Sequence, residues 1–434
     1  MHSQIFPPQA CILRQRESRN LTRILLPTNY RDTAKEQKLL CHIGFDNNKV
    51  IKDFIRIHHE GIDTNKISLS GSYPDYQHDG QNVRKQHAFR WWQKNAVALL
   101  PHAISSRLIA RRGSSQQAIQ NSLATFFRKH GVDSLFVEFG DAAAYIAPLA
   151  AQLQIPLVAH FHGHDAHRTS LLTNEMLAKY RFMFTSAAAI LCVSRFMLSS
   201  LIQLGCPEDK LIYNPYGPRD KFFSIQPNYA QNVLSVGRFT DIKANYLVVL
   251  AFQRALESCP NAKLIMAGDG ELLETCKTIS NCFGLDKSIS FLGAVEHATV
   301  DHLFQNACCF AQHSVTPSYG DAEGTPNTIL EACAASLPVI STNHAGIPDI
   351  IAHERTGYLV AERDINGMAA NMVKLLNNQD LCTQIGQAAR NRVKTHFSSE
   401  KHLLRLNLAI ELAKSRDAAG ISALSKQSRL IGFE

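Results

Sequence analysis

The sequence predicts an α/β protein built from two doubly wound domains that face each other across a central cleft. From residue 131 onward, two series of short apolar runs alternate with helix-length segments, which is the pattern that stacked β-α-β units produce. Residues 216–231 interrupt this alternation with two prolines among polar residues, as an interdomain linker does. A chain of 434 residues is also too long for one ordinary core.

Each apolar run predicts one strand, and the segments between the runs predict helices. In the first series we expect strands at Ser134–Glu138, Leu157–Phe161, Ala189–Val193 and Lys210–Tyr213. In the second series we expect strands at Asn232–Val236, Lys263–Ala267, Ile289–Leu292, Cys308–Gln312 and Pro338–Ser341. The second-series helices are expected at Tyr246–Ser258, Glu271–Cys282, Thr299–Asn306 and Asn327–Ala335. Ligands bind such sheets at the carboxyl ends of the strands.

These elements divide the chain into an N-terminal domain, residues 1–221, and a C-terminal domain, residues 222–398. The remaining segment, residues 399–434, is predicted to pack back on the N-terminal domain. We expect it to begin with a helix at Ser399–Lys414 and to end as a polar, loose tail.

The composition, 45% hydrophobic and 19% charged residues, is that of a soluble globular protein. No apolar run is long enough to span a membrane, the N-terminus lacks a signal-peptide pattern, and the eleven cysteines form no CxxC pair. We therefore expect reduced core cysteines and a cytoplasmic protein. A net charge of +8 permits an acidic partner such as a nucleotide or an anionic lipid surface. No nucleic-acid-binding motif is present.

The segment from Glu323 to Glu331 carries the main chemical signal. Thr325 is a plausible N-cap with Pro326 at the first helical position, and the N–H groups of a helix start suit a phosphate or a sugar hydroxyl. Both glutamates can face one cleft, where carboxylates accept hydrogen bonds from vicinal hydroxyls. Alone, the two acids could equally be solvated residues that flank an N-cap.

A second signal is a buried strand that ends in Gly237-Arg238 and is followed by Lys243. An arginine fork and a lysine charge at a sheet's ligand edge fit a diphosphate, although both could be ordinary surface charges. A third signal is the run His160, His162 and His164. Because Gly163 should end the strand, the three rings would not share one side, so we expect no metal site and assign His162 to hydrogen bonding.

Taken together, residues 131–397 resemble the retaining glycosyltransferases of family 4, which have two Rossmann-like domains in the GT-B architecture. Within that family the chain is similar to the bacterial exopolysaccharide branch that includes the colanic-acid transferases. The resemblance is carried by Phe139-Gly140, Phe161-His162-Gly163-His164-Asp165, Val193-Ser194-Arg195, Val236-Gly237-Arg238, Lys243, Gly268-Asp269-Gly270, Phe291-Leu292-Gly293, the two glutamates, and Ala345-Gly346-Ile347-Pro348-Asp349.

The resemblance implies a nucleotide-diphosphate sugar as donor, a glycan or lipid-linked acceptor, and no cofactor or metal. It implies that Arg238 and Lys243 grip the diphosphate, that Glu331 binds the ribose, and that Glu323 contacts the donor sugar. His162 would reach the reacting sugar from the N-terminal domain. The other implied donor-binding positions are Gly237, Gly293, Val295, Gly324, Thr325, Pro326 and Asn327.

Two departures from the family pattern stand out. Ala244 follows Lys243 where the family usually has glycine, which we expect to be a small steric change. The N-terminal stretch Gln9–Leu13 has neither the acid nor the glycines of the family at this place, which leaves the acceptor and its linkage open. Elsewhere in the first 130 residues we predict only a helix at Ala10–Arg19 and a strand at Leu21–Pro27.

Other functions remain open. The altered N-terminal stretch allows a nucleotide-sugar-binding protein without transferase activity. A nicotinamide-dependent oxidoreductase would need a Gly-x-Gly-x-x-Gly turn, which the sequence lacks. Basic residues in the N-terminal third allow peripheral contact with an anionic membrane, or are simply a solvated face; they are Arg14, Arg16, Arg19, Arg23, Arg107, Arg111, Arg112, Arg128 and Lys129.

Overall fold

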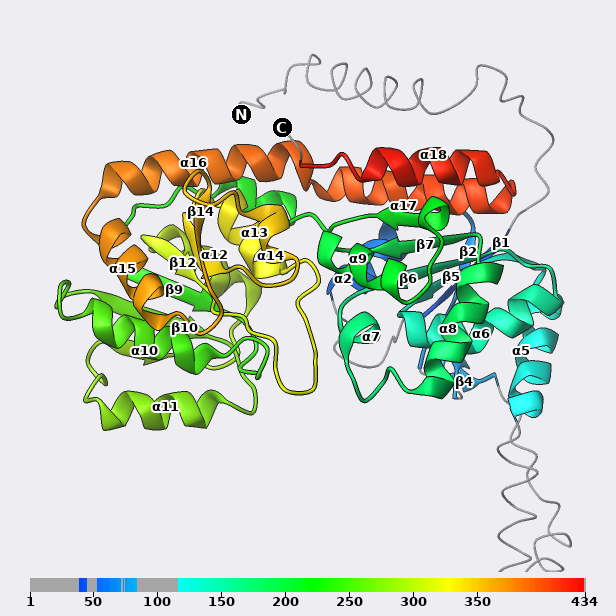
Figure 1. Cartoon of the computed structure of the whole chain (residues 1–434), viewed down its shortest axis with the longest axis horizontal. Helices are drawn as coiled ribbons and strands as arrows, with labels where there is room; N and C mark the ends of the chain where they lie inside the picture. Colours follow the sequence, from blue (N-terminus) through cyan, green and yellow to red (C-terminus); the bar gives the residue numbers. More distant parts are fainter. Residues whose placement is uncertain (1–38, 45–52, 72, 74, 84–115, 433–434) are drawn as a thin grey trace, which may run out of the picture.

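The computed structural model describes residues 39–44, 53–71, 73, 75–83 and 116–432. Within them lie two six-stranded parallel sheets, one in each domain, with helices on both faces (Figure 1). This is the doubly wound architecture predicted from the sequence. The predicted helix at residues 10–19 and strand at residues 21–27 lie outside the described residues.

The N-terminal sheet has the strand order β2-β1-β5-β6-β7-β8. Its strands are β1 (Leu39–Ile43), β2 (Lys66–Leu69), β5 (Val132–Glu138), β6 (Leu157–Phe161), β7 (Ala189–Cys192) and β8 (Leu211–Tyr213). The helices are α2 (Asp53–Gly61), α5 (Gln116–His130), α6 (Gly140–Gln152), α7 (His164–His167), α8 (Asn174–Ser186) and α9 (Arg195–Gln203). A two-stranded hairpin, β3 (Gln77–His78) and β4 (Gln81–Asn82), forms a separate small sheet that a Ser70–Gln77 bridge joins to the end of β2.

The C-terminal sheet has the order β11-β10-β9-β12-β13-β14. Its strands are β9 (Asn232–Val236), β10 (Lys263–Ala267), β11 (Ile289–Phe291), β12 (Cys309–Ala311), β13 (Val339–Thr342) and β14 (Gly357–Val360). Its helices are α10 (Asn245–Ala255), α11 (Leu273–Cys282), α12 (His297–Gln305), α13 (Asn327–Ala334), α14 (Ile347–Ile350), α15 (Ile365–Leu376) and α16 (Gln379–His396).

The predicted strands of both series are present, with ends that differ by up to two residues. Strands β1, β2 and β14 and the hairpin strands β3 and β4 were not predicted. The predicted linker, residues 216–231, contains a short 3₁₀ helix, η2 (Asp220–Ser224), whose Phe222 is fully buried. The linker is therefore packed against the protein rather than extended.

The chain returns to the N-terminal domain after α16. Helix α17 (Ser399–Lys414) has the predicted bounds, but a second helix, α18 (Ala418–Ser428), follows where a loose tail was expected. That expectation was wrong because Ile421 and Leu424 supply an apolar face, which packs with α17 against one side of the N-terminal sheet. Figure 1 shows α16 lying along the C-terminal domain, with α17 and α18 along the N-terminal domain.

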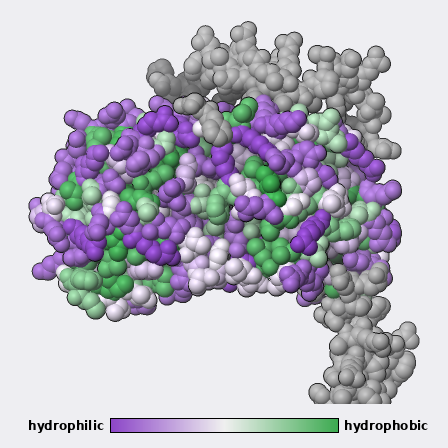
Figure 2. Space-filling view, in the orientation of Figure 1, coloured by the Kyte–Doolittle hydropathy of each residue, from purple (hydrophilic) through white to green (hydrophobic). Residues whose placement is uncertain are grey.

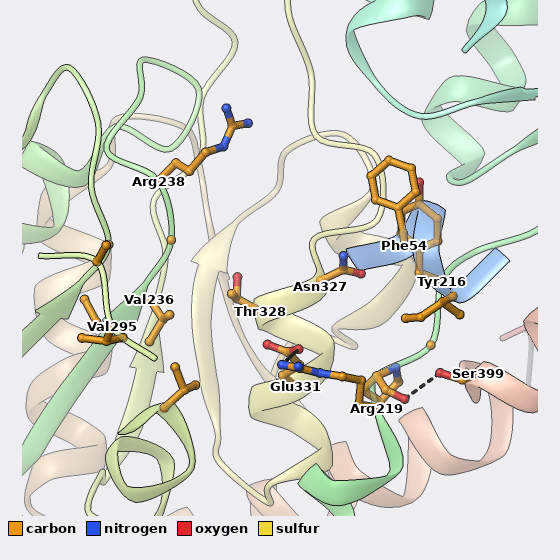
Figure 3. A pocket seen from close by; sticks show the side chains of 18 of the residues that line it. Phe54, Tyr216, Arg219, Val236, Arg238, Val295, Asn327, Thr328, Glu331 and Ser399 are labelled. Atoms are coloured by element: carbon orange, nitrogen blue, oxygen red, sulfur yellow. Dashed lines mark hydrogen bonds and ion pairs between the residues drawn. The ribbon is translucent and has the colours of Figure 1, made fainter. Parts of the chain in front are cut away.

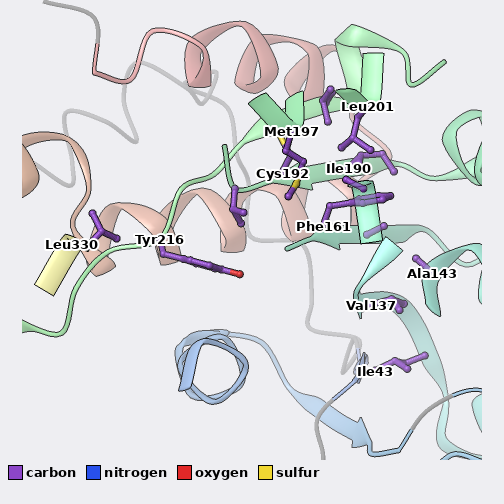
Figure 4. Close-up of a cluster of buried hydrophobic side chains, with 14 of the residues drawn as sticks. Ile43, Val137, Ala143, Phe161, Ile190, Cys192, Met197, Leu201, Tyr216 and Leu330 are labelled. Carbon is purple, nitrogen blue, oxygen red and sulfur yellow. The ribbon is translucent and has the colours of Figure 1, made fainter. Parts of the chain in front are cut away.

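The largest hydrophobic core covers the other face of the N-terminal sheet and continues into the C-terminal domain. Phe161, Ile190 and Met197 pack at its centre, while Tyr216 and Leu330 lie toward the domain junction (Figure 4). On the surface, hydrophilic residues are spread over both domains, with smaller hydrophobic areas between them (Figure 2). No helix among the described residues is long and apolar enough to cross a membrane.

Candidate active site

A cavity of about 370 Å³ lies between the two domains. The C-terminal domain contributes the ends of β9 and β10, the loop after β11, and the start of α13 (Figure 3). The N-terminal domain contributes α2 and the linker, and α17 closes one side. Of the predicted site residues, the lining includes Gly237, Arg238, Val295, Asn327 and Glu331, and Thr328 joins them.

The end of β9 holds Arg238 and Lys243, as the strand pattern predicted. Arg238 is exposed and projects from the strand end at the cavity rim (Figure 3). A tight turn, in which the Lys243 N–H donates to the Thr240 carbonyl at 3.0 Å, brings the lysine back beside Gly237. Ala244, next in the chain, is in the left-handed region with φ of 39°. This conformation explains why the family usually has glycine at this position.

Lys243 does not lie free at the cavity. Its Nζ forms an ion pair with Glu323 Oε1 at 2.8 Å, and the Ser314 hydroxyl donates to the same oxygen at 3.1 Å. Burial by itself would raise the pKa of Glu323, but the charge and hydrogen bond of Lys243 outweigh it and lower that pKa below its usual value. Glu323 is therefore ionised near neutral pH.

The start of α13 differs from the prediction by one residue. Pro326 is the N-cap and Asn327 begins the helix, because the Thr325 hydroxyl donates to the carbonyl of Val193 in the N-terminal domain and does not cap. The N–H groups of Asn327 and Thr328 fall in the first turn, where a helix provides no carbonyl partner. These groups lie at the cavity, and they suit an anion.

Glu331 points into the cavity from the second turn of α13 (Figure 3). Its Oε1 accepts from Arg219 Nη2 at 3.2 Å. Across from it, Val295 and Val236 form an apolar wall. Gly293 lies just before this wall, in the left-handed region, and its carbonyl accepts from Gly268 N–H at 2.7 Å.

The histidine run follows the predicted geometry. Strand β6 ends at Phe161, so His162 lies in the loop after it and His164 begins α7. The ring of His162 is not at the cavity surface. Its Nε2 donates to Glu138 Oε2 at 2.7 Å, and its Nδ1 lies against the hydroxyl of Tyr216. Its backbone carbonyl faces Gly324, where an added Cβ would clash with it.

Glu138, the last residue of β5, is fully buried and gathers imidazole rings from several elements. Its Oε1 accepts from His42 Nε2 at 3.0 Å and from His58 Nδ1 at 2.7 Å. His58, Glu138 and His160 together are also the one group that could hold a metal ion in the part of the chain that the structure describes. His160 is fully buried, and neither ring nitrogen has a hydrogen-bond partner among the described residues.

No role for Glu138, His58, Tyr216 or Arg219 was predicted from the sequence. Glu138 could have been noticed as a charged residue at the end of a buried strand. His58 could have been noticed as part of an adjacent histidine pair on an amphipathic helix, α2, for which no element was predicted. Tyr216 and Arg219 lie in the linker, whose polar composition gave no sign that they would line the cavity.

Comparison with known proteins agrees with this architecture. Residues 219–392 match the family described as Glycosyl transferases group 1, and residues 74–217 match the family described as Glycosyltransferase Family 4. The amylovoran biosynthesis glycosyltransferase AmsK of Erwinia amylovora is 29% identical over 319 residues, which is 72% of this chain and 78% of the relative. The putative colanic acid biosynthesis glycosyltransferase WcaL of Escherichia coli is 26% identical over 327 residues, 74% of this chain and 78% of the relative.

Solved structures show the same fold. HepE of Anabaena, in complex with UDP, superposes with a TM-score of 0.63 at 15% identity and covers 85% of this chain and 98% of its own. A glycosyltransferase from Rickettsia africae superposes with a TM-score of 0.65 at 18% identity, over 88% of this chain and 100% of its own. The paired sheets thus have the GT-B architecture. The chain belongs to glycosyltransferase family 4, whose members retain anomeric configuration.

Proposed function

We propose that the chain transfers a sugar from a nucleotide-diphosphate sugar to a glycan or lipid-linked acceptor in the synthesis of a cell-surface polysaccharide. The observation that carries this proposal is that Arg238 and the start of α13 meet at one cavity edge, with the Lys243–Glu323 pair beside Gly237 of the same edge. The names of the relatives AmsK and WcaL support the polysaccharide context. The UDP bound in HepE supports a nucleotide donor.

In this proposal the donor's diphosphate lies between Arg238 and the N–H groups of Asn327 and Thr328. The bond between the anomeric carbon and the diphosphate oxygen breaks as the acceptor oxygen bonds to that carbon from the same face. The acceptor proton passes to the departing diphosphate. Donors fixed in place stabilise the charge that develops on the diphosphate, and such fixed groups contribute a large share of catalysis. We propose that this needs no metal or cofactor.

The Lys243–Glu323 pair provides the sharpest test. Incubated with UDP-, GDP- and ADP-sugars and a polysaccharide-repeat acceptor, Lys243→Ala and Glu323→Ala should each lower the transfer rate by at least about a hundredfold. A matched control is the surface pair Lys277–Glu274, which has the same 2.8 Å separation; Lys277→Ala should leave the rate unchanged. Turnover near that of the wild type in both site variants would contradict the proposal.

The donor base can be found by a thermal-shift screen against UDP, GDP and ADP, because tight binding raises the melting temperature. A nucleotide that binds without transfer of its sugar to any acceptor would instead favour a binding protein without transferase activity. The altered stretch Gln9–Leu13, which motivates that alternative, lies outside the described residues.

We also propose a cytoplasmic protein with peripheral contact to an anionic membrane. Of the basic residues that motivate this, Arg128 and Lys129 lie in the last turn of α5, and the others lie outside the described residues. Flotation with vesicles of phosphatidylglycerol at low salt tests the contact. A chain that stays with the soluble fraction would contradict it.

A further inference from the structure

The imidazole rings around Glu138 allow the protons of its hydrogen bonds to be assigned one by one. His402, on α17, lies with Nδ1 at 3.0 Å from the carbonyl oxygen of Pro215. A carbonyl only accepts, so His402 carries a proton on Nδ1. Burial holds the pKa of His402 well below its usual value, so the ring is neutral and its Nε2 is a bare acceptor.

His58 lies between this acceptor and the carboxylate. Its Nε2 is 2.8 Å from His402 Nε2, and its Nδ1 is 2.7 Å from Glu138 Oε1. Since His402 Nε2 accepts, His58 must donate from Nε2; since a carboxylate accepts, His58 must also donate from Nδ1. Both ring nitrogens of His58 then carry protons, which makes the ring an imidazolium.

The second carboxylate oxygen fixes His162. Its Nε2 lies 2.7 Å from Glu138 Oε2 and therefore donates, while its Nδ1 accepts the hydroxyl proton of Tyr216. Burial raises the pKa of Tyr216 well above its usual value and lowers that of His162, so the tyrosine keeps its proton and the histidine stays neutral. A hydrogen bond at one ring nitrogen decides the tautomer at the other.

We propose that Glu138 and His58 form a buried carboxylate–imidazolium pair that holds His162 in its Nε2–H tautomer, with Glu138 as a positioning residue for the N-terminal side of the active site. The effect on catalysis rests on the proposed function. His58, Tyr216 and His402 line the cavity, so the network forms part of its wall. Through the His162 backbone it also sets where the N-terminal domain meets Gly324.

The other polar groups around the Glu138–His58 pair are consistent with one extra proton, namely the second ring proton of His58. His42, on β1, donates its Nε2 proton to Glu138, and its Nδ1 lies 3.2 Å from His59. His160 is 3.7 Å from Glu138 Oε2, beyond hydrogen-bond distance. Arg405, whose charge acts on His402, donates from Nε to Asn214 Oδ1 at 3.0 Å.

A metal ion fits these distances less well. Zinc holds nitrogen at about 2.0–2.1 Å and carboxylate oxygen at about 2.0–2.2 Å, which places tetrahedral ligand atoms roughly 3.3 Å apart. His58 Nδ1 and Glu138 Oε1 are 2.7 Å apart, the separation of a charge-assisted hydrogen bond. A hydrogen bond, rather than a metal ion, therefore fits between these two atoms.

The test is nitrogen-15 NMR of the full chain with labelled histidine at pH 8.5, about two units above the ordinary histidine pKa of about 6.5. We expect one histidine with both nitrogens protonated in the wild type. That signal should vanish in His58→Gln and in Glu138→Gln but remain in His353→Gln, a control at an exposed histidine. The His162 signals, identified with His162→Gln, should show the Nε2–H tautomer in the wild type and change in Glu138→Gln.

The same variants distinguish a positioning role of Glu138 from a purely structural role in the fold. We expect Glu138→Gln to lower kcat about 10- to 100-fold while UDP affinity stays within about twofold, because the nucleotide contacts are in the C-terminal domain. If Glu138→Gln does not fold, Tyr216→Phe replaces it: the doubly protonated signal should persist, the His162 signals should move, and kcat should fall several-fold.

Four results would overturn the proposal: no doubly protonated histidine in the wild type, its survival in Glu138→Gln, His162 signals or kcat unchanged by the variants, or one equivalent of bound zinc in the purified chain. The NMR results need no substrate. A wild type that shows the pair but transfers no sugar would therefore count against the proposed function alone.

Discussion

The C-terminal side of the cavity holds its buried acid, Glu323, against a lysine, whereas the N-terminal side holds Glu138 among imidazole rings. Both carboxyl pKa values lie below the usual value, although burial opposes this in each case. Lys243 offsets the cost of burying the carboxylate on the C-terminal side, and histidines offset it on the N-terminal side. Lysine stays charged throughout the neutral range, while imidazole changes its charge near pH 6.5.

The two halves should therefore respond to different variables. On the C-terminal side Glu323 keeps its charge from mildly acid to neutral pH, as the proposed binding of a diphosphate nearby would require. The N-terminal side depends on His160, His162 and His402, which burial keeps neutral in the fold, around the proposed His58 imidazolium. As the pH falls, the folded arrangement of the N-terminal side should therefore be lost before that of the C-terminal side.

The largest expected effect is on stability between pH 6.5 and 5. Burial lowers the pKa of His160, His162 and His402, so below about pH 6.5 the unfolded chain binds protons that the folded chain does not. Their stabilising contribution is present above pH 6.5 and is lost as the pH falls through the folded-state values. Each such histidine adds about 1.4 kcal/mol per pH unit to the slope of unfolding free energy against pH. Glu138 adds nothing in this window, because its folded pKa lies well below the usual value of a glutamate.

Urea unfolding at pH 6.5, 6.0 and 5.5, with hydrogen exchange to locate the loss, measures this slope. His160→Leu should reduce it by about 1.4 kcal/mol per pH unit, and His353→Gln should leave it unchanged. The C-terminal domain has a matching group in His313, whose pKa burial lowers to about 4. An N-terminal domain that keeps its exchange protection longer than the C-terminal domain would contradict the comparison.

The next largest effect should come from separating the two halves. In Gly324→Ala the added Cβ would clash with the His162 carbonyl and the Val193 side chain. Relieving this clash would move the two halves of the site apart by about 1 Å. A displacement of that size at an active site costs about a hundredfold in rate, or about 2.7 kcal/mol of barrier. Transfer assays and UDP titration should show the rate lost and nucleotide affinity kept. Gly284→Ala, with open space around it, serves as the control, and equal effects in the two variants would refute this reading.

A smaller effect is expected at the hydrogen bond that crosses between the domains. Thr325→Val removes the hydroxyl that donates to Val193 and leaves that carbonyl without this donor. The cost is about 1 kcal/mol, which should appear as a roughly fivefold fall in kcat/KM. Thr325→Ser keeps the hydroxyl and should behave as the wild type. Similar losses in both variants would mean that the methyl group, and not the hydrogen bond, matters.

The smallest effect is expected at Ala244. Glycine would relieve a left-handed conformation that costs about 1 kcal/mol or more, but it would remove a methyl buried against Leu247 and Val315 that is worth about 0.8 kcal/mol. These contributions nearly cancel, so Ala244→Gly should change the unfolding free energy by less than about 1 kcal/mol in urea titration. A larger loss would show that the methyl also holds Lys243 in place.

Much of the fold could be predicted because its strands are near-continuous apolar runs. Strands such as β9 and β10 have the predicted bounds, since parallel strands are covered on both faces and their sequence signal is strong. Strand β2, with Lys66 among its four residues, was missed because it is a short edge strand with little apolar signal. The register between strands follows from tertiary packing and could not be read from a single sequence.

The site divides in the same way. The placement of Arg238, Lys243 and Glu331 could be predicted because they follow a strand end and a helix start within one domain. The network around Glu138 could not, because His58, Glu138 and His402 are separated by up to 344 residues in the chain and meet only after α2 and α17 dock. The prediction that Thr325 is the N-cap was wrong for the same reason, because its hydroxyl donates to the carbonyl of Val193 in the other domain.

The two places where the chain passes between the domains lie side by side. An added Cβ at Gly217, in the first passage, would clash with the backbone of Phe397 and Ser399 in the second, and the Ser399 hydroxyl donates to the Pro218 carbonyl at 2.7 Å. Because both connections cross at this point, we expect the domains to move relative to each other by a hinge rotation here. Gly217 also lines the cavity, so mutations there should alter both the domain motion and the site itself.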